Sequence, residues 1–242
     1  MESMRADIFL PLEIEAVVFD FDGTLGHLNI DFPLMRRRIL DLSGEYGVNL
    51  NGREGRYVLE LISSLKGDIE GHDDNRAREF YDRAMEIVTS IEISAARKGE
   101  LIPGTIEMLE EFRRRGIKLG VVTRNCLAAI SIILPGIGDY FGGAIITRER
   151  AINFKPHPEH LQIALHHLST RPEKSAMVGD HPMDILVGKS VGTKTIGVLT
   201  GYSTREELEA AGADHILAKA ADLAGLLKSG LNNRLFLTLT TS

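Results

Sequence analysis

The sequence predicts an α/β protein in which a parallel β-sheet is covered by helices on both faces and an all-helical block is inserted into the chain. From about residue 100 onward, short apolar runs alternate with segments of helical periodicity. Strands separated by helices of this length form βαβ units, and such units build a parallel sheet. Residues 26–98 break this rhythm, because they are rich in charged residues and helix formers and contain no convincing strand. The two patterns together predict a sheet core and a separate helical lobe.

Apolar runs mark the strands, and helical periodicity marks the segments between them. The expected strands are 16–19, 117–122, 143–146, 175–178, 193–198 and 215–217. The expected helices of the core are 104–115, 128–134, 158–168, 183–191, 204–211 and 221–227. Gly116 suits the C-cap of the first of these helices, and Pro135-Gly136 ends the second. Residues 232–242 form either an added edge strand or a frayed end.

The inserted block is expected to contain helices at 32–46, 53–66 and 74–97. The chain would then consist of a core, residues 1–26 and 100–242, and a helical domain, residues 27–99. Both connections of the insertion would leave the core beside the carboxyl end of the first strand. Gly26 and Gly99 are candidate hinges, because glycine absorbs backbone changes cheaply. We therefore expect a mobile lobe that closes over this strand end.

Composition excludes several classes of protein. The 242 residues carry a net charge of −6, whereas a general nucleic-acid or membrane binder needs a basic surface. The first residues lack the basic-then-apolar order of a signal peptide, and no apolar run approaches the roughly 20 residues that span a bilayer. Cys126 is the single cysteine, so no intramolecular disulfide forms. We expect a cytoplasmic monomer or homodimer without nucleic-acid or membrane partners.

The stretch Asp20-Phe21-Asp22-Gly23-Thr24-Leu25 follows the first apolar strand and is the most informative part of the chain. Strand residues alternate sides, so Asp20 and Asp22 point the same way from the carboxyl end of the strand. Two carboxylates this close repel each other, and a hard cation such as Mg²⁺ offsets that repulsion. An ordinary acidic turn is the alternative, but it does not explain a doubled Asp at strand spacing.

Other polar residues follow the later strands, and ligands in open α/β sheets bind at such strand ends. Thr123-Arg124-Asn125 follows the second strand, Lys155 lies in the loop before the 158–168 helix, and Asp180 and Asp184 follow the strand at 175–178. In chain order, the strand ends therefore offer two Asp, one Thr, one Lys and two more Asp.

This ordered set resembles the haloacid dehalogenase superfamily, and within it the phosphatases that carry a helical cap after the first motif. The resemblance covers roughly residues 14–227 and implies a Rossmann-like core. It implies that Asp20 is the nucleophile and that Asp22 is the general acid and base. It also implies that Thr123 holds the phosphate oxygens and that Lys155 neutralises the charge on the nucleophile and on the transferring group. It places Asp180 and Asp184 at the metal end of the site, and we expect Mg²⁺ to be held by Asp20, Asp22, Asp180 and Asp184. Related enzymes include phosphoglycolate phosphatases, so a small phosphorylated metabolite is the expected substrate.

Phosphoryl-transfer chemistry agrees with these roles. A carboxylate nucleophile divides hydrolysis into two steps through an aspartyl-phosphate, and the leaving alkoxide needs a proton from a second acid. Substrate contacts are expected from Thr123, Arg124 and Asn125. Arg36, one of three consecutive arginines, is either an anion contact in the cap or part of a solvated surface. His181-Pro182 stands where relatives have Ser or Thr, and it suits the start of a helix.

Two other functions stay open on the sequence. A sugar phosphomutase would use the same aspartyl-phosphate and return the phosphoryl group to its substrate. A phospho-acceptor signalling module also combines acidic residues, a Thr or Ser and a Lys on a parallel sheet. The inserted block of roughly 70 residues and the doubled Asp speak against the signalling module.

Overall fold

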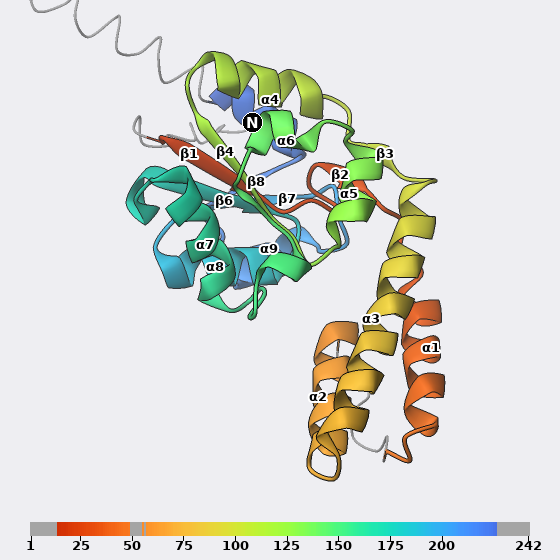
Figure 1. Ribbon diagram of the computed structural model, residues 1–242. Helices are drawn as coiled ribbons and strands as arrows, with labels where there is room; N and C mark the ends of the chain where they lie inside the picture. The colour runs from red at the N-terminus through yellow and green to blue at the C-terminus, as the bar shows by residue number, and fades with distance from the viewer. Residues whose placement is uncertain (1–13, 49–54, 56, 227–242) are drawn as a thin grey trace, which may run out of the picture. The chain divides into compact units, whose positions relative to one another are not determined.

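The computed structural model describes residues 14–48, 55 and 57–226. These residues form two compact units, one of which is Leu28–Lys98 and the other the remainder of the chain (Figure 1). Each unit has its own buried apolar residues and is considered by itself below. Among the described residues, no helix is long and apolar enough to cross a membrane.

The larger unit is built on a six-stranded sheet in which every neighbouring pair of strands is parallel. The strands lie in the order β5-β4-β1-β6-β7-β8. Their bounds are Ala16–Phe19 (β1), Lys118–Val122 (β4), Ile145–Ile146 (β5), Ser175–Gly179 (β6), Lys194–Val198 (β7) and His215–Leu217 (β8). This sheet confirms the predicted α/β class. The β1 strand lies at its centre, between β4 and β6, so residues that follow β1 have neighbours on both sides.

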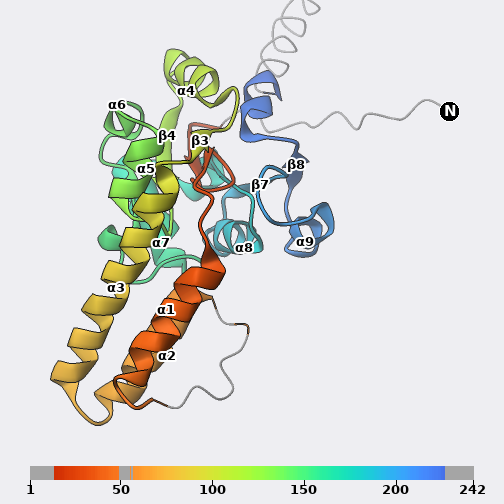
Figure 2. The same cartoon turned by 90° about the vertical axis from the view of Figure 1, so that its right-hand side faces the viewer.

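Helices cover both faces of this sheet (Figures 1 and 2). On one face, α7 packs on β4 and β5, and α8 packs on β6 and β7; on the other face, α4 and α6 contact β4. The helices of this unit are α4 (Thr105–Arg114), α5 (Leu127–Ile133), α6 (Ile137–Phe141), α7 (Pro158–Leu168), α8 (Pro182–Val191) and α9 (Arg205–Ala210). Short 3-10 turns occupy Arg148–Arg150, Pro172–Lys174 and Ala220–Asp222.

The apolar strand sequences become the core of this unit. All four residues of β1 are fully buried, as expected for a central parallel strand that is covered on both faces. Val18 and Met177 pack against the α7 side with Leu161 and Leu165. On the other side, Phe19 stacks on Phe112 of α4, with 6.5 Å between the ring centres. Burial from both sides fixes the carboxyl end of β1 in place.

Several short elements were not predicted. The strands β2 (Gly26–His27) and β3 (Glu100–Leu101) form a two-residue antiparallel pair, which is too short to give a periodic pattern. Pro135-Gly136 separates α5 from the five-residue helix α6, which follows it directly. The first two residues of the helix expected at 221–227 belong to the 3-10 turn Ala220–Asp222, and residues 223–226 are helical. Residue 227 and the 232–242 segment lie outside the described residues.

The Leu28–Lys98 unit contains α1 (Phe32–Gly44), α2 (Val58–Glu70) and α3 (Asp74–Ala96). Asp31 caps α1 by accepting a 2.8 Å hydrogen bond from the Leu34 N–H, and Asp73 caps α3 in the same way. The first residues of the expected 53–66 helix fall in 49–54, outside the described residues, and α2 begins at Val58. The helices bury an apolar interior that includes Ile39, Leu61, Leu65 and Phe80.

Candidate active site

The central strands place the expected catalytic residues at one edge of the sheet. The β1 strand is paired in register with both β4 and β6, so their carboxyl ends are adjacent. Asp20 follows β1, Thr123 follows β4 and Asp180 follows β6. These three positions, far apart in sequence, therefore become neighbours at the carboxyl edge, where open α/β sheets bind ligands.

A tight turn follows β1. The N–H groups of Leu25 and Gly26 donate to the carbonyl of Phe21 at 2.8 and 3.1 Å, and the Phe21 side chain is buried. Gly23 adopts φ +82°, a conformation that side chains disfavour. A Cβ atom on Gly23 would also lie 2.6 Å from Oδ2 of Asp180. Glycine is therefore required at position 23 by the close approach of this turn to Asp180, and not by turn formation alone.

Lys155 forms the electrostatic centre of the site. Its Nζ lies 2.7 Å from Oδ1 of Asp20 and 2.6 Å from Oδ1 of Asp184, and the lysine side chain is 3% exposed. Burial by itself would lower the pKa of Lys155, but the carboxylates of Asp184 and Asp20 outweigh it and raise the pKa above its usual value. Lys155 is therefore a buried ammonium ion that contacts two carboxylates, one after β1 and one in the first turn of α8.

The carboxylates outnumber this ammonium group, and their arrangement suits a hard cation. Asp20, Asp180 and Asp184 each present an oxygen atom within 4.8 Å of the others. Burial, reinforced by Asp20 and Asp184, raises the pKa of Asp180 to about 8. Burial also raises the pKa of Asp184 to about 6, despite its contact with Lys155. Oxygen donors with unbalanced negative charge are the ligands that Mg²⁺ prefers.

Asp22 is not part of this three-carboxylate group. Its backbone forms a bridge with Gly26, and its side chain is half-buried. The roles expected of Asp22, as general acid and base and as a contact of the metal ion, stay predictions.

Asp180 is held by a loop that the sequence reading did not assign to the site. The N–H of Tyr202 donates to Oδ2 of Asp180 at 3.2 Å, and Thr200 donates to the carbonyl of Gly23 at 2.6 Å. A Cβ atom at Gly201 would lie 1.7 Å from Oδ2 of Asp180, so only glycine fits there. The sequence carries a signal for this loop, because Thr200-Gly201-Tyr202 begins two residues after the expected 193–198 strand, at the same edge of the sheet.

Asp184 is fixed by the first turn of α8. The N–H of His181 donates to Oδ2 of Asp184 at 3.1 Å, and Nδ1 of His181 accepts from the Met183 N–H at 3.1 Å. The two side chains form a capping box, in which each satisfies a backbone N–H of the helix start. His181 is thus the N-cap residue of α8, the helix-start role that its position before Pro182 indicates.

The loop after β4 carries Thr123, Arg124 and Asn125, the three residues of this loop that are expected to contact the substrate. Thr123 and Asn125 bond to each other, whereas Arg124 stacks on an aromatic ring. The Thr123 hydroxyl donates to Oδ1 of Asn125 at 2.8 Å, and the Asn125 N–H donates back to Oγ1 of Thr123 at 3.2 Å. The guanidinium group of Arg124 lies over the Phe154 ring, 5.7 Å from its centre. The backbone carbonyl of Arg124 accepts a 2.9 Å hydrogen bond from the guanidinium group of the buried Arg148. Arg148 was not among the residues expected in the site.

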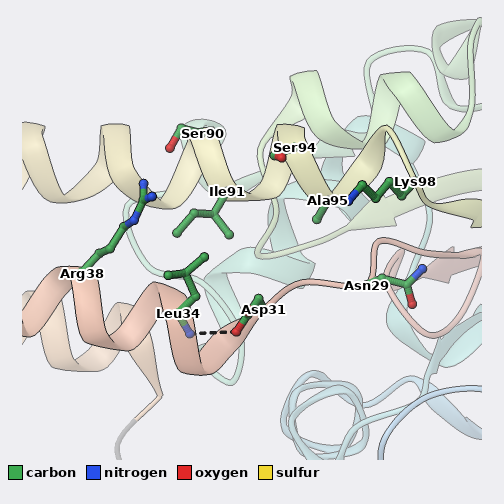
Figure 3. A pocket seen from close by; sticks show the side chains of 9 residues that line it. All are labelled: Asn29, Asp31, Leu34, Arg38, Ser90, Ile91, Ser94, Ala95 and Lys98. Atoms are coloured by element: carbon green, nitrogen blue, oxygen red, sulfur yellow. Dashed lines mark hydrogen bonds between the residues drawn. The ribbon is translucent and has the colours of Figure 1, made fainter.

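Arg36 lies on α1 in the other unit, where the structure shows a groove between α1 and α3 (Figure 3). The groove has a volume of about 320 Å³ and is lined by Asn29, Asp31, Leu34, Arg38, Ser90, Ile91, Ser94, Ala95 and Lys98. Among the three consecutive arginines, Arg38 lines this groove, while Arg36 and Arg37 lie on other parts of the helix surface. The groove is lined by two cationic side chains, one carboxylate and two hydroxyl groups.

Comparison with known proteins shows the family. Residues 14–192 match the model of the haloacid dehalogenase-like hydrolases. The chain belongs to this family. It is 33% identical over 218 residues to the pyrophosphatase PpaX of Anoxybacillus flavithermus. The aligned region covers 89% of this chain and 98% of that protein. The family and these relatives identify the chain as a phosphatase of the haloacid dehalogenase type, as the resemblance predicted.

Solved structures agree on the fold. A protein of Bacteroides fragilis described as a haloacid dehalogenase-like hydrolase is 25% identical, with a TM-score of 0.66 over 86% of this chain and 99% of that chain. A β-phosphoglucomutase of Clostridium difficile gives a TM-score of 0.65 at 18% identity over 90% of this chain and 99% of that chain. Because a mutase shares the fold, the fold alone does not separate phosphatases from mutases.

Proposed function

We propose that this phosphatase is Mg²⁺-dependent and hydrolyses small phosphorylated compounds through an aspartyl-phosphate on Asp20. One observation carries the proposal: the Asp20 carboxylate lies at the end of the central strand, 2.7 Å from the buried Lys155 ammonium and grouped with Asp180 and Asp184. This arrangement combines a nucleophile, a neutralising cation and carboxylate oxygens that are placed to bind a metal ion.

In the first step, an oxygen of the Asp20 carboxylate attacks phosphorus and the bond from phosphorus to the leaving oxygen breaks. The carboxylic acid of Asp22 gives its proton to that leaving oxygen. In the second step, water attacks the phosphorus of the aspartyl-phosphate and the Asp22 carboxylate takes a proton from the water. Asp20 is then regenerated and inorganic phosphate leaves. Lys155 stays protonated and offsets the charge on Asp20 and the transferring group.

Asp20, Asp180 and Asp184 would hold Mg²⁺, together with the backbone carbonyl of Asp22. When bound there, the ion would lower the repulsion between the phosphate oxygens and the carboxylates. Thr123, Asn125 and Arg124 would contact the phosphoryl oxygens, since they follow the strand next to β1.

Inorganic pyrophosphate and phosphoglycolate are the two candidate substrates to assay first. The curated relatives named pyrophosphatase PpaX, including the one at 33% identity, favour inorganic pyrophosphate. The resemblance to phosphoglycolate phosphatases keeps phosphoglycolate as the second candidate. We also propose that the Leu28–Lys98 unit selects among substrates, and that its α1–α3 groove, which Arg38, Lys98 and Asp31 line, contributes to this selection (Figure 3).

The test is the release of inorganic phosphate from pyrophosphate, phosphoglycolate and p-nitrophenyl phosphate. We expect turnover with Mg²⁺, none after exhaustive chelation, and inhibition by Ca²⁺, which prefers more ligands and looser geometry. Glucose 1-phosphate is included, with glucose 6-phosphate as the product to detect. Phosphate release without isomerised product supports hydrolysis, whereas isomerisation without net release would identify a mutase. A stable phosphoprotein without turnover would instead indicate a signalling module, and full activity without metal would refute the Mg²⁺ requirement.

A further inference from the structure

His160 is fully buried in the first turn of α7 and has no part in the chemistry described above. It lies five residues after Lys155 and packs under the loop that carries this lysine. Buried polar side chains need hydrogen-bond partners, and those of His160 come from two different segments of the core.

The two ring nitrogens of His160 have distinct partners. The backbone N–H of Lys155 donates to Nδ1 at 3.1 Å, and Nε2 lies 3.1 Å from the carbonyl oxygen of Ile146. A backbone N–H can only donate and a carbonyl can only accept, so Nδ1 must be unprotonated and Nε2 must carry the hydrogen. Only the neutral Nε2–H tautomer satisfies both contacts.

The electrostatic surroundings agree with this geometry. Burial and the nearby charge of Lys155 lower the pKa of His160 to about 3, so the ring is neutral near pH 7. A protonated ring would direct a second N–H at the Lys155 N–H and leave that backbone group without an acceptor. His160 therefore serves as a fixed bridge and not as a proton carrier.

The bridge joins the end of β5 to the backbone of Lys155. Ile146 is the last residue of β5 and is fully buried, so its carbonyl is a rigid anchor. Lys155 lies in a loop, and its Nζ must reach Oδ1 of both Asp20 and Asp184 within 2.7 Å. A lysine side chain has four rotatable bonds, so the ammonium group is placed well only where the backbone is also fixed.

We propose that His160 is a positioning residue that ties the Lys155 backbone to β5, so that the ammonium group stays between the Asp20 and Asp184 carboxylates. The inference rests on the proposed function, because it takes Lys155 as the cation beside the nucleophile. Displacement of a catalytic group by about 1 Å typically costs on the order of 10²-fold in rate. Loss of the bridge should therefore lower kcat more than it raises KM.

Two substitutions of His160 separate the bridge from simple packing. His160→Leu fills a similar volume but removes the acceptor for the Lys155 N–H. His160→Asn retains an amide oxygen near the position of Nδ1 and can still accept from that N–H. His166→Leu, on the exposed side of the same helix, is the matched control. The readouts are kcat and KM for p-nitrophenyl phosphate, with the fraction of folded protein measured by circular dichroism.

We expect His160→Leu to lose about 10²-fold in kcat per folded molecule with little change in KM. His160→Asn should recover only part of the loss, because it keeps the contact with Lys155 but not the contact with Ile146 of β5. His166→Leu should match the wild type. Wild-type kcat in folded His160→Leu would overturn the inference, and so would wild-type kcat in folded His160→Asn. These results are distinct from a failure of the proposed function, which would show as wild-type turnover in Asp20→Asn.

A measurement on the unaltered protein covers the case in which His160→Leu does not fold. Nitrogen-15 NMR of the histidine rings at pH 7 distinguishes the two neutral tautomers and the charged ring. The inference requires an Nε2–H tautomer for His160, with Nδ1 shifted as a hydrogen-bond acceptor. An Nδ1–H tautomer or a charged ring would overturn it.

Discussion

The strand-end site of the core and the α1–α3 groove of the Leu28–Lys98 unit both combine charged and hydroxyl side chains, but they hold them differently. In the core, Lys155, Asp180 and Asp184 are at most 3% exposed, and each is fixed by ion pairs or backbone N–H groups. In the groove, the side chains of Arg38, from the middle of α1, and Lys98, just after α3, are exposed (Figure 3). Buried charges interact strongly because solvent screens them little, whereas exposed charges contribute little.

The buried core site suits catalysis, whereas the exposed groove suits selection among substrates. A site that must hold carboxylates, a cation and a phosphoryl group in one geometry needs a rigid and buried frame. A surface that selects among small anions needs only modest interactions and tolerates substitution. We therefore expect changes in the core to remove activity and changes in the groove to alter preference among substrates.

The largest effect is expected at Asp20. Asp20→Asn removes the nucleophile, and we expect turnover to fall by on the order of 10⁴-fold or more. Circular dichroism should show that the fold survives, because Lys155 keeps its ion pair with Asp184. Asp139→Asn, an exposed change in the same unit, is the control and should keep full activity. Phosphate release at wild-type rate from Asp20→Asn would remove this residue from the chemistry.

A smaller and substrate-dependent effect is expected at Asp22. An alkoxide leaving group needs a proton, whereas an activated aryl oxide needs little help, and general acid catalysis is typically worth about 10²–10⁴-fold. Asp22→Asn should therefore slow hydrolysis of an alkyl phosphate far more than that of p-nitrophenyl phosphate. The check is kcat/KM for both substrates. Equal losses would assign Asp22 to metal positioning instead of proton transfer.

The burial of His160 also predicts that the free energy of unfolding depends on pH. Its pKa is about 3 in the folded protein and about 6.5 in an unfolded chain, so its stabilising contribution is present above pH 6.5 and is lost as the pH falls toward 3. The difference in unfolding free energy between the wild type and His160→Asn should shrink by up to about 1.4 kcal/mol per pH unit below pH 6.5. Urea unfolding at pH 7 and pH 5 measures it, with His166→Asn as control. A difference that does not change with pH would contradict the buried, neutral ring.

The smallest effect is expected in the groove. Arg38→Ala should raise KM for phosphoglycolate by about 2- to 5-fold, in line with an exposed charge interaction, and should leave p-nitrophenyl phosphate unchanged. The neighbouring Arg37→Ala is the matched control, because Arg37 is exposed on the same helix but does not line the groove. Identical kinetics for the two variants would show that the groove takes no part in selection.

Much of the core follows from the sequence, because each element there is marked by a pattern that its burial requires. The apolar run before Asp20 becomes a fully buried central strand, and the parallel order brings Asp20, Thr123 and Asp180 to one edge. Strand-end chemistry is predictable in this way because strand direction and side-chain alternation fix where a residue points. By contrast, the two-residue strands β2 and β3 contain no apolar run, and the five-residue helix α6 is too short to show helical periodicity.

The remaining site features depend on tertiary contacts that leave no local signal. The role of Gly201 arises from its approach to Asp180, 21 residues earlier in the chain, and that of His160 from the Ile146 carbonyl. Among the three consecutive arginines, helical geometry limits how many share a face, but the neighbouring helix decides which one does. Arg38 is the one beside α3 in the groove, and the substrate contact expected of Arg36 stays a prediction.

The central claim is that Asp20 carries the phosphoryl group during turnover. The most direct test is to mix the enzyme with substrate and Mg²⁺, quench in acid within the first turnover, and analyse the peptides by mass spectrometry. The mechanism predicts one added phosphoryl group on the peptide that contains Asp20, lost on treatment with hydroxylamine and absent from Asp20→Asn. Turnover with no phosphorylated peptide at any quench time, or a phosphoryl group on another residue, would contradict it.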